Sequence, residues 1–168
     1  DIEVNLTQGH KWTGHGYFDA NFGTRALEAD FSFWTWGRYP LKDRALCFYD
    51  ATLRDGRHFD LAVEITPDGR VVETTAPPRT RFARNPWAVR RETRADPGTT
   101  PRPHLSLLEA PFYSRALVET QIEGERTIGM HEALDLTRFR QPLLKPMLAV
   151  RVPRRSPDKQ PRHNPHRR

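Results

Sequence analysis

The sequence predicts an all-β domain, an antiparallel barrel or sandwich with one short helix near its end. Short runs in which apolar and polar residues alternate recur along the chain, and this period of two is typical of half-buried strands. Turn signals such as Asp55-Gly56 and Pro67-Asp68-Gly69 separate the runs. The length of 168 residues fits one domain.

Eight segments show strand-like patterns. In chain order, the expected strands are 2–6, 27–36, 45–53, 58–65, 71–72, 112–122, 126–132 and 147–152. The clearest pair is 45–53 with 58–65, because the Asp-Gly dipeptide between them favours a tight hairpin turn. In the segment 112–122, Ala116, Val118 and Ile122 are expected on one buried face.

Three segments do not show this alternation of apolar and polar residues. Residues 77–103 are rich in proline and arginine and predict a long irregular connection with at most one short strand. Residues 134–144 have mixed spacing and contain Pro142, which predicts a short helix or covering turn. Residues 153–168 combine four prolines with six basic residues and predict a disordered tail. The expected organisation is therefore a β-domain over 1–152 and a basic tail over 153–168.

Composition excludes several functional classes. The tail has a net charge of +5 out of +6 for the whole chain, so the isoelectric point near 10.0 describes the tail and gives no support for nucleic-acid binding. One cysteine, Cys47, excludes an internal disulfide framework. No apolar run reaches the 18 residues of a spanning helix, and the polar start DIEVNLTQGH is unlike a signal peptide. Phosphate-binding and serine-hydrolase motifs are missing from the sequence.

The stretch from Trp12 to Gly23 holds the most informative polar residues. If it is extended, four polar side chains share one face: His15, Tyr17, Asp19 and Asn21. One interpretation places this face in water, as on most alternating strands. The other places it in a barrel lumen, where an apolar setting would raise the pKa of the Asp19 carboxyl group and let it act as a general acid. The spacing alone leaves both open.

Aromatic residues and one histidine are further candidates. The aromatic cluster consists of Trp12, Phe31, Phe33, Trp34, Trp36 and Tyr39. It predicts either a large core or a pocket that binds an apolar ligand and stabilises a cation. Trp34 and Trp36 share a face opposite Phe31 and Phe33, but alternation does not say which pair points inward. His131 is either a hydrogen-bonded structural residue or a side chain directed into the same interior as Asp19.

Four segments together resemble the carotenoid 1,2-hydratase family, also called hydroxyneurosporene synthase. They are GHGYFDANFG (14–23), RALEADFSFWTWGR (25–38), GMHEALDLTRF (129–139) and QPLLKPMLAVRVPR (141–154). The first is the most specific, because its Gly, His, Tyr, Asp and Asn residues occur in order at close spacing. Ala26-Leu27-Glu28 replaces the Pro-Leu-Glu that is usual in the family.

The resemblance implies a lipocalin-like (calycin-like) architecture of two related barrels, of which this chain holds the C-terminal one beside an upstream domain. It implies a lyase, without a redox cofactor or metal, that hydrates the terminal C1–C2 double bond of acyclic carotenes of the lycopene and neurosporene type. Asp19 would be the acid, supported by Tyr17. The expected substrate-binding residues are His15, Asn21, Trp12, Trp34, Trp36 and His131.

A carotene dissolves in the bilayer, so a cytoplasmic protein attached peripherally to the membrane is expected. The contact would run from Leu143-Leu144 into the basic tail 153–168.

Two alternatives stay open. An isomerase or cyclase on the same fold would leave product mass unchanged, and a lipocalin-like module would only bind an apolar ligand, with Asp19 dispensable.

Overall fold

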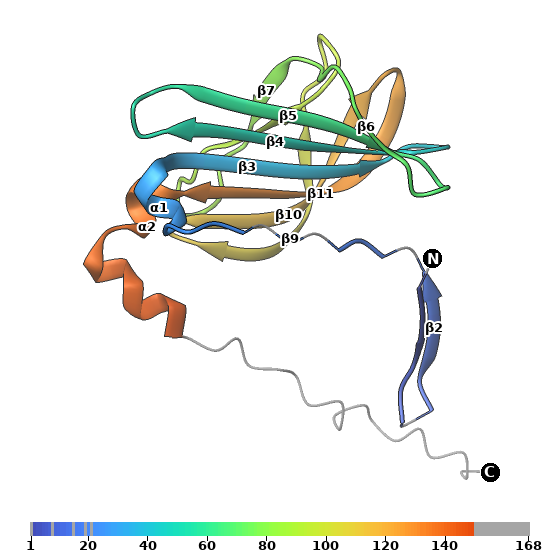
Figure 1. The fold of residues 1–168 in the computed structure, drawn as a ribbon, viewed down its shortest axis with the longest axis horizontal. Helices are drawn as coiled ribbons and strands as arrows, with labels where there is room; N and C mark the ends of the chain where they lie inside the picture. Colours follow the sequence, from blue (N-terminus) through green and yellow to red (C-terminus); the bar gives the residue numbers. More distant parts are fainter. Residues whose placement is uncertain (1, 8, 15, 19, 21, 150–168) are drawn as a thin grey trace, which may run out of the picture.

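The protein is built on one antiparallel sheet of seven strands. The computed structural model describes residues 2–7, 9–14, 16–18, 20 and 22–149. The strand order is β6-β5-β4-β3-β11-β10-β9 (Figure 1). The bounds are β3 (Phe31–Pro40), β4 (Ala45–Leu53), β5 (His58–Ile65), β6 (Val71–Glu73), β9 (Arg102–Ala110), β10 (Tyr113–Ile122) and β11 (Glu125–Asp135). The all-β prediction is confirmed. The described strands form an open sheet, because its end strands β6 and β9 are not paired with each other, and the expected closed barrel is not seen.

Two smaller sheets and three short helices complete the described chain. The hairpin of β1 (Ile2–Asn5) and β2 (Lys11–Gly14) lies apart from the main sheet (Figure 1). The second small sheet pairs β7 (Arg79–Phe82) with β8 (Arg91–Arg94). The helices are α1 (Leu27–Asp30), α2 (Leu136–Phe139) and the 3-10 helix η1 (Pro142–Ala149).

Most expected strands are confirmed, and three predictions are wrong. The first four residues of the expected strand 27–36 form α1, in which Glu28 is favourable near the positive end of the helix dipole. The connection 77–103 holds both β7 and β8 and the first residues of β9, because its arginines find carboxylate partners in the folded protein. Residues 147–149 belong to η1 and not to a strand. The tail 153–168 lies outside the described residues.

The hydrophobic core lies between the sheet and the segment that carries β7 and β8. We call this side of the sheet the covered face. It is marked by three buried clusters: Tyr39, Leu46, Phe48, Ala62 and Ile122; Phe33, Val89 and Ala133; and Phe82, Ala116 and Val118. The Tyr39 hydroxyl lies 2.8 Å from that of Thr93 on β8. Phe33 therefore belongs to the core, which settles the orientation that alternation left open.

A buried ion pair also joins β8 to the sheet. Arg94 Nε donates to Asp50 Oδ2 at 3.0 Å, Nη2 donates to Oδ1, and Nη1 donates to the carbonyl oxygen of Pro77. Both side chains are almost fully buried. Each carboxylate oxygen thus accepts a charge-assisted hydrogen bond, which offsets the cost of removing both charges from water.

Close backbone packing explains one glycine on β11. A Cβ atom at Gly129 would lie 2.3 Å from the carbonyl oxygen of Arg38 and 2.3 Å from the ring of Tyr39. The ring of Tyr39 therefore lies directly over this strand, and no larger residue fits without moving the ring or the backbone of β3.

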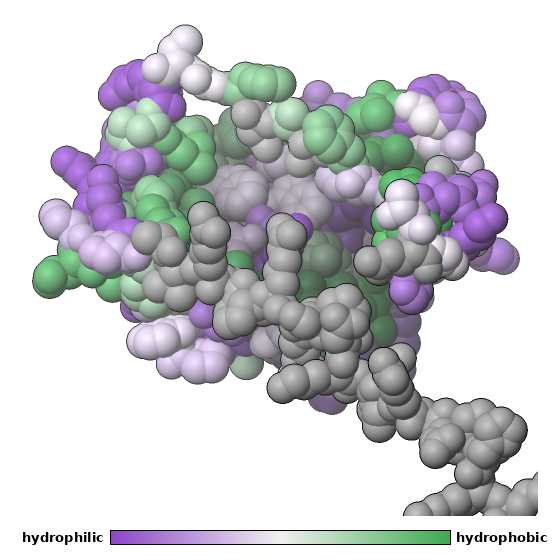
Figure 2. Space-filling view, turned by 90° about the horizontal axis from the view of Figure 1, so that it is seen from below, coloured by the Kyte–Doolittle hydropathy of each residue, from purple (hydrophilic) through white to green (hydrophobic). Residues whose placement is uncertain are grey.

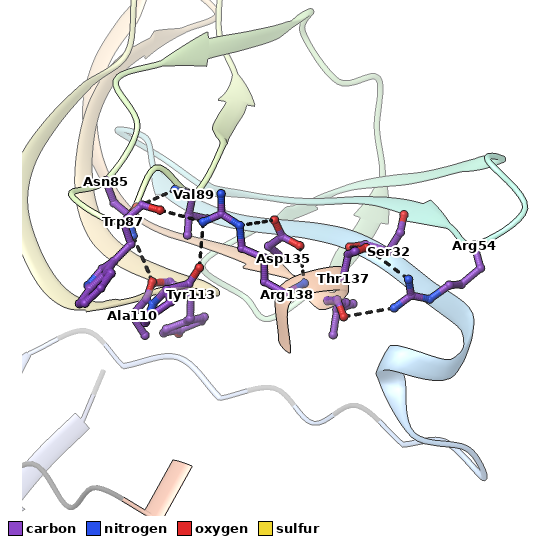
Figure 3. Close-up of polar contacts among 12 residues, drawn as sticks. Ser32, Arg54, Asn85, Trp87, Val89, Ala110, Tyr113, Asp135, Thr137 and Arg138 are labelled. Carbon is purple, nitrogen blue, oxygen red and sulfur yellow. Dashed lines mark hydrogen bonds and ion pairs between the residues drawn. The ribbon is translucent and has the colours of Figure 1, made fainter. Parts of the chain in front are cut away.

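Polar contacts hold the loops at one end of the sheet (Figure 3). Asp135 ends β11 and caps α2 by accepting the backbone N–H of Arg138 at 2.9 Å. The Arg138 guanidinium donates to the carbonyl oxygens of Trp87 and Pro111. Asn85 accepts the backbone N–H of Val89 at 2.7 Å. These bonds connect the loop between β7 and β8 to the end of β11.

Candidate functional site

The opposite side of the sheet carries the aromatic residues that the sequence singles out. Residues directly opposite one another on paired strands share a face. Trp36 on β3 is opposite Tyr49 on β4 and Glu132 on β11, and Trp34 is opposite Ala51 and Leu134. We call this side, centred on Trp36, the aromatic face.

Tyr17 packs on the aromatic face. Its ring stacks on the ring of Trp36 with centroids 5.6 Å apart and an interplanar angle of 30°, within the range of favourable aromatic pairs. Its hydroxyl lies 3.5 Å from the hydroxyl of Tyr49, and the guanidinium of Arg38 lies 5.2 Å from its ring centroid. The structure therefore brings Tyr17 and Trp36 together, with Trp34 on the same face.

Trp36 is the most buried of these residues, with 8% of its surface exposed. The edge of the Tyr49 ring approaches it at a centroid distance of 6.3 Å. Its indole N–H has no hydrogen-bond partner among the residues that the structure describes. A buried donor without a partner is costly, so this N–H is a strong candidate to bind an oxygen atom brought by a ligand.

A carboxylate lies next to this cluster on the same face. Glu132 forms an ion pair with Arg115, whose Nε lies 3.0 Å from Oε1, and 16% of the Glu132 side chain is exposed. Burial, followed by the nearby Glu132 carboxylate, raises the pKa of the Tyr113 phenol above its usual value. Tyr113 therefore stays protonated. Glu132 is not among the predicted site residues, although it follows His131 directly and alternation places it on the other face.

His131 lies on the covered face, away from Tyr17. It is fully buried, and its Nε2 lies 2.8 Å from the carbonyl oxygen of Glu92 on β8. Because a carbonyl oxygen only accepts, Nε2 carries the proton. Burial, aided by Arg91, lowers the pKa of His131 to about 4. A neutral histidine that connects β11 to β8 matches the structural interpretation of this residue.

Of the remaining predicted site residues, the structure describes Trp12 alone. Trp12 lies on the separate hairpin opposite Val4, with 54% of its surface exposed. His15, Asp19 and Asn21 lie outside the described residues. The roles that the resemblance implies for these residues stay predictions.

Other surfaces have a different character. A cavity of 510 Å³ at the end of the sheet is lined by polar and charged side chains, among them Arg84, Arg90, Arg138 and Asp135. Within the described ranges, no group of three or more His, Cys, Asp or Glu side chains is placed to hold a metal ion.

Figure 2 shows a hollow near the centre of the view from below, where pale and green side chains gather while purple ones lie toward the sides.

Comparisons with known proteins place the chain in a family. The model of the family described as carotenoid hydratase CrtC matches residues 1–161. The chain is 71% identical over 157 residues to an acyclic carotenoid 1,2-hydratase of Rhodobacter capsulatus, covering 93% of this chain and 56% of that protein. It is 67% identical over 154 residues to the protein of that name from Cereibacter sphaeroides, covering 92% of this chain and 55% of the relative.

A more distant match is to a Penicillium thymicola protein named quinolone epoxide rearrangement protein, 32% identical over 77 residues, which cover 46% of this chain and 21% of that protein. No solved structure matches significantly. The chain spans a little over half the length of its two bacterial relatives named above. The resemblance seen in the sequence is confirmed, and the chain belongs to the carotenoid hydratase CrtC family.

Proposed function

We propose that the protein to which this chain belongs adds water to the terminal C1–C2 double bond of an acyclic carotene, by acid catalysis and without a redox cofactor. Relatives that are 71% and 67% identical are named acyclic carotenoid 1,2-hydratases, which supports carotenoid hydration. The observation that supports a particular site is the stacking of Tyr17, two residues before Asp19 in the sequence, on Trp36.

The chemistry requires an acid and an environment that tolerates a cation. The carboxylic acid of Asp19 gives its proton to C2, the π electrons form the new C2–H bond, and a tertiary cation is left at C1. A water oxygen then forms the C1–O bond and loses a proton, which yields a tertiary alcohol. The Tyr17 hydroxyl supports the acid, and His15 and Asn21 hold the acid or the water.

Aromatic rings support the cationic step. The faces of indole and phenol rings attract positive charge, by about 0.5–2 kcal/mol depending on desolvation. The rings of Tyr17 and Trp36 lie together, with Tyr49 at their edge. The same rings provide an apolar surface for the polyene. Trp34 lies on this face as well, whereas any role of Trp12 and His131 in substrate binding would need an arrangement other than the one described.

The experiment is mass analysis of pigments from a host that makes acyclic carotenes and expresses the complete gene. The wild type is expected to give a product heavier by one water, and Asp19→Asn, which keeps the size of the side chain, is expected to give none. Asp43→Asn is the matched control, because Asp43 is 71% exposed. Hydrated product from Asp19→Asn would move the acid elsewhere. Absence of hydrated product from a folded wild type would refute hydration.

Rearrangement on the same fold is the second candidate. It is favoured by the partial match to the protein named quinolone epoxide rearrangement protein. An isomerase or cyclase would also use an acid beside aromatic rings, but it leaves the mass of the substrate unchanged. The pigment analysis therefore separates the two functions. A binding module without catalysis would yield unaltered carotene in both the wild type and the Asp19→Asn variant.

The location and partners that we propose follow from the substrate. None of the helices in the described part of the chain is long and apolar enough to cross a bilayer. We propose a cytoplasmic protein that binds the membrane surface, where its substrate dissolves. Leu143 and Leu148 on η1 are 90% and 57% exposed, and the basic tail 153–168 follows them, which supports contact with anionic lipid. An upstream domain with a related lipocalin-like fold completes the proposed protein.

A further inference from the structure

Glu132 holds a position on the aromatic face that its sequence neighbours do not share. It lies directly opposite Trp36 on the paired strands β11 and β3, whereas His131 faces the core. Side chains opposite one another on antiparallel strands have Cβ atoms about 4.5–5.5 Å apart. Trp36 therefore lies between Tyr49 on β4 and Glu132 on β11, with Tyr17 stacked on it.

The neighbours of Glu132 hold it in place without filling its acceptor positions. Arg115 Nε lies 3.0 Å from Oε1 in an ion pair, and Tyr113 lies beside the carboxylate. A carboxylate has about four acceptor positions, which leaves capacity for a water molecule. Sixteen per cent of the side chain is exposed, which leaves it accessible from the aromatic face.

Hydration needs a group with these properties. When water attacks the C1 cation, the new C–O–H₂ group is strongly acidic and must lose a proton. The Asp19 carboxylate has just given its proton to C2, and a second acceptor next to the water lets both steps follow without rearrangement.

We propose that Glu132 is the general base of the reaction: it binds the attacking water and accepts its proton as the C1–O bond forms. This inference rests on the proposed hydratase function. The electron pair of the water oxygen forms the bond to C1, and the O–H pair stays on oxygen as the proton moves to Glu132. Asp19 is then ionised and Glu132 protonated, and exchange with solvent restores both. No oxidant, reductant or further reactant is required.

The test uses the complete protein with an acyclic carotene in vesicles and compares kcat and KM for three variants. Glu132→Gln is expected to lower kcat at least 100-fold, within the range of general-base catalysis, with KM nearly unchanged. Glu119→Gln is the matched control, because Glu119 is an exposed glutamate on the same face of β10 as Arg115. The kcat of this control variant is expected to stay within twofold of the wild-type value. A Glu132→Gln variant that folds and keeps kcat within threefold overturns the proposal.

Arg115→Gln separates a base from a structural ion pair. This variant keeps the Glu132 carboxylate and removes the cation that stabilises its charge. At least a tenth of the maximal kcat is expected to be retained with KM nearly unchanged, because the carboxylate that accepts the proton is still present. A loss as large as that of Glu132→Gln overturns the proposal even if Glu132→Gln does not fold. Failure of the proposed function is recognised separately, since the wild type itself would then form no hydrated product.

Discussion

Acid is expected to destabilise the protein through one buried histidine. His131 is neutral in the fold, with a pKa lowered from 6.5 to about 4. The Nδ1 atom has no partner among the described residues, and the charged group that acts on the ring is Arg91 of β8, while the contact with Glu92 is through its backbone carbonyl oxygen. Protonation therefore places an unpaired positive charge in the core. The unfolded chain has no such penalty and binds the proton near pH 6.5.

The magnitude follows from the size of the shift. Each pKa unit corresponds to 1.36 kcal/mol, so a shift from 6.5 to about 4 gives about 3 kcal/mol. Because the pKa of His131 is lowered in the folded state, its contribution of about 3 kcal/mol to the free energy of unfolding is fully present above pH 6.5. This contribution is lost as the pH falls from 6.5 to 4, because the unfolded state binds more protons in that window. Below pH 4 the contribution of this residue is constant.

The measurement is urea denaturation at several pH values between 7 and 4, for the wild type and for His131→Gln. Gln keeps a side-chain N–H that can donate to the Glu92 carbonyl oxygen and does not titrate. Between pH 7 and pH 4 the wild type is expected to lose about 3 kcal/mol more of its unfolding free energy than the variant does. His104→Gln, at an exposed position of β9, is expected to behave as the wild type. Parallel curves for the wild type and His131→Gln would refute the reasoning.

Two further predictions concern the buried ion pair and the membrane contact. Arg94→Met is expected to lower the unfolding free energy by about 3–5 kcal/mol, because it leaves the charge of Asp50 buried without its partner. The exposed Arg57→Met serves as control and is expected to cost far less, because water already screens its ion pair with Asp55; equal losses in denaturation experiments would contradict the burial argument. Replacing both Leu143 and Leu148 by Ser is expected to weaken sedimentation with anionic vesicles at least tenfold, since each buried leucine contributes about 1.5–3 kcal/mol. Unchanged sedimentation would remove η1 from the proposed contact.

Local patterns explain why much of the fold was predictable. The hairpin of β4 and β5 follows from alternation on both sides of Asp55-Gly56, and each of these signals lies within a few residues. The strands β7 and β8 were not predictable, because Arg94 and Arg91 become compatible with burial only beside Asp50 and Glu109, which are distant in sequence. The helix α1 likewise depends on Arg54, which donates to the carbonyl oxygen of Glu28.

The sequence by itself determined the strand-rich class, the shared face of Trp34 and Trp36, and the family resemblance, because periodicity and short motifs are local properties. Only the tertiary structure decided which face meets the core. Alternation divides a strand into two faces but gives neither of them a direction. The direction here comes from the segment that carries β8, in which Val89 packs against Phe33 and the carbonyl oxygen of Glu92 bonds to His131. That packing turns His131 inward and leaves Glu132 opposite Trp36, on which Tyr17 stacks.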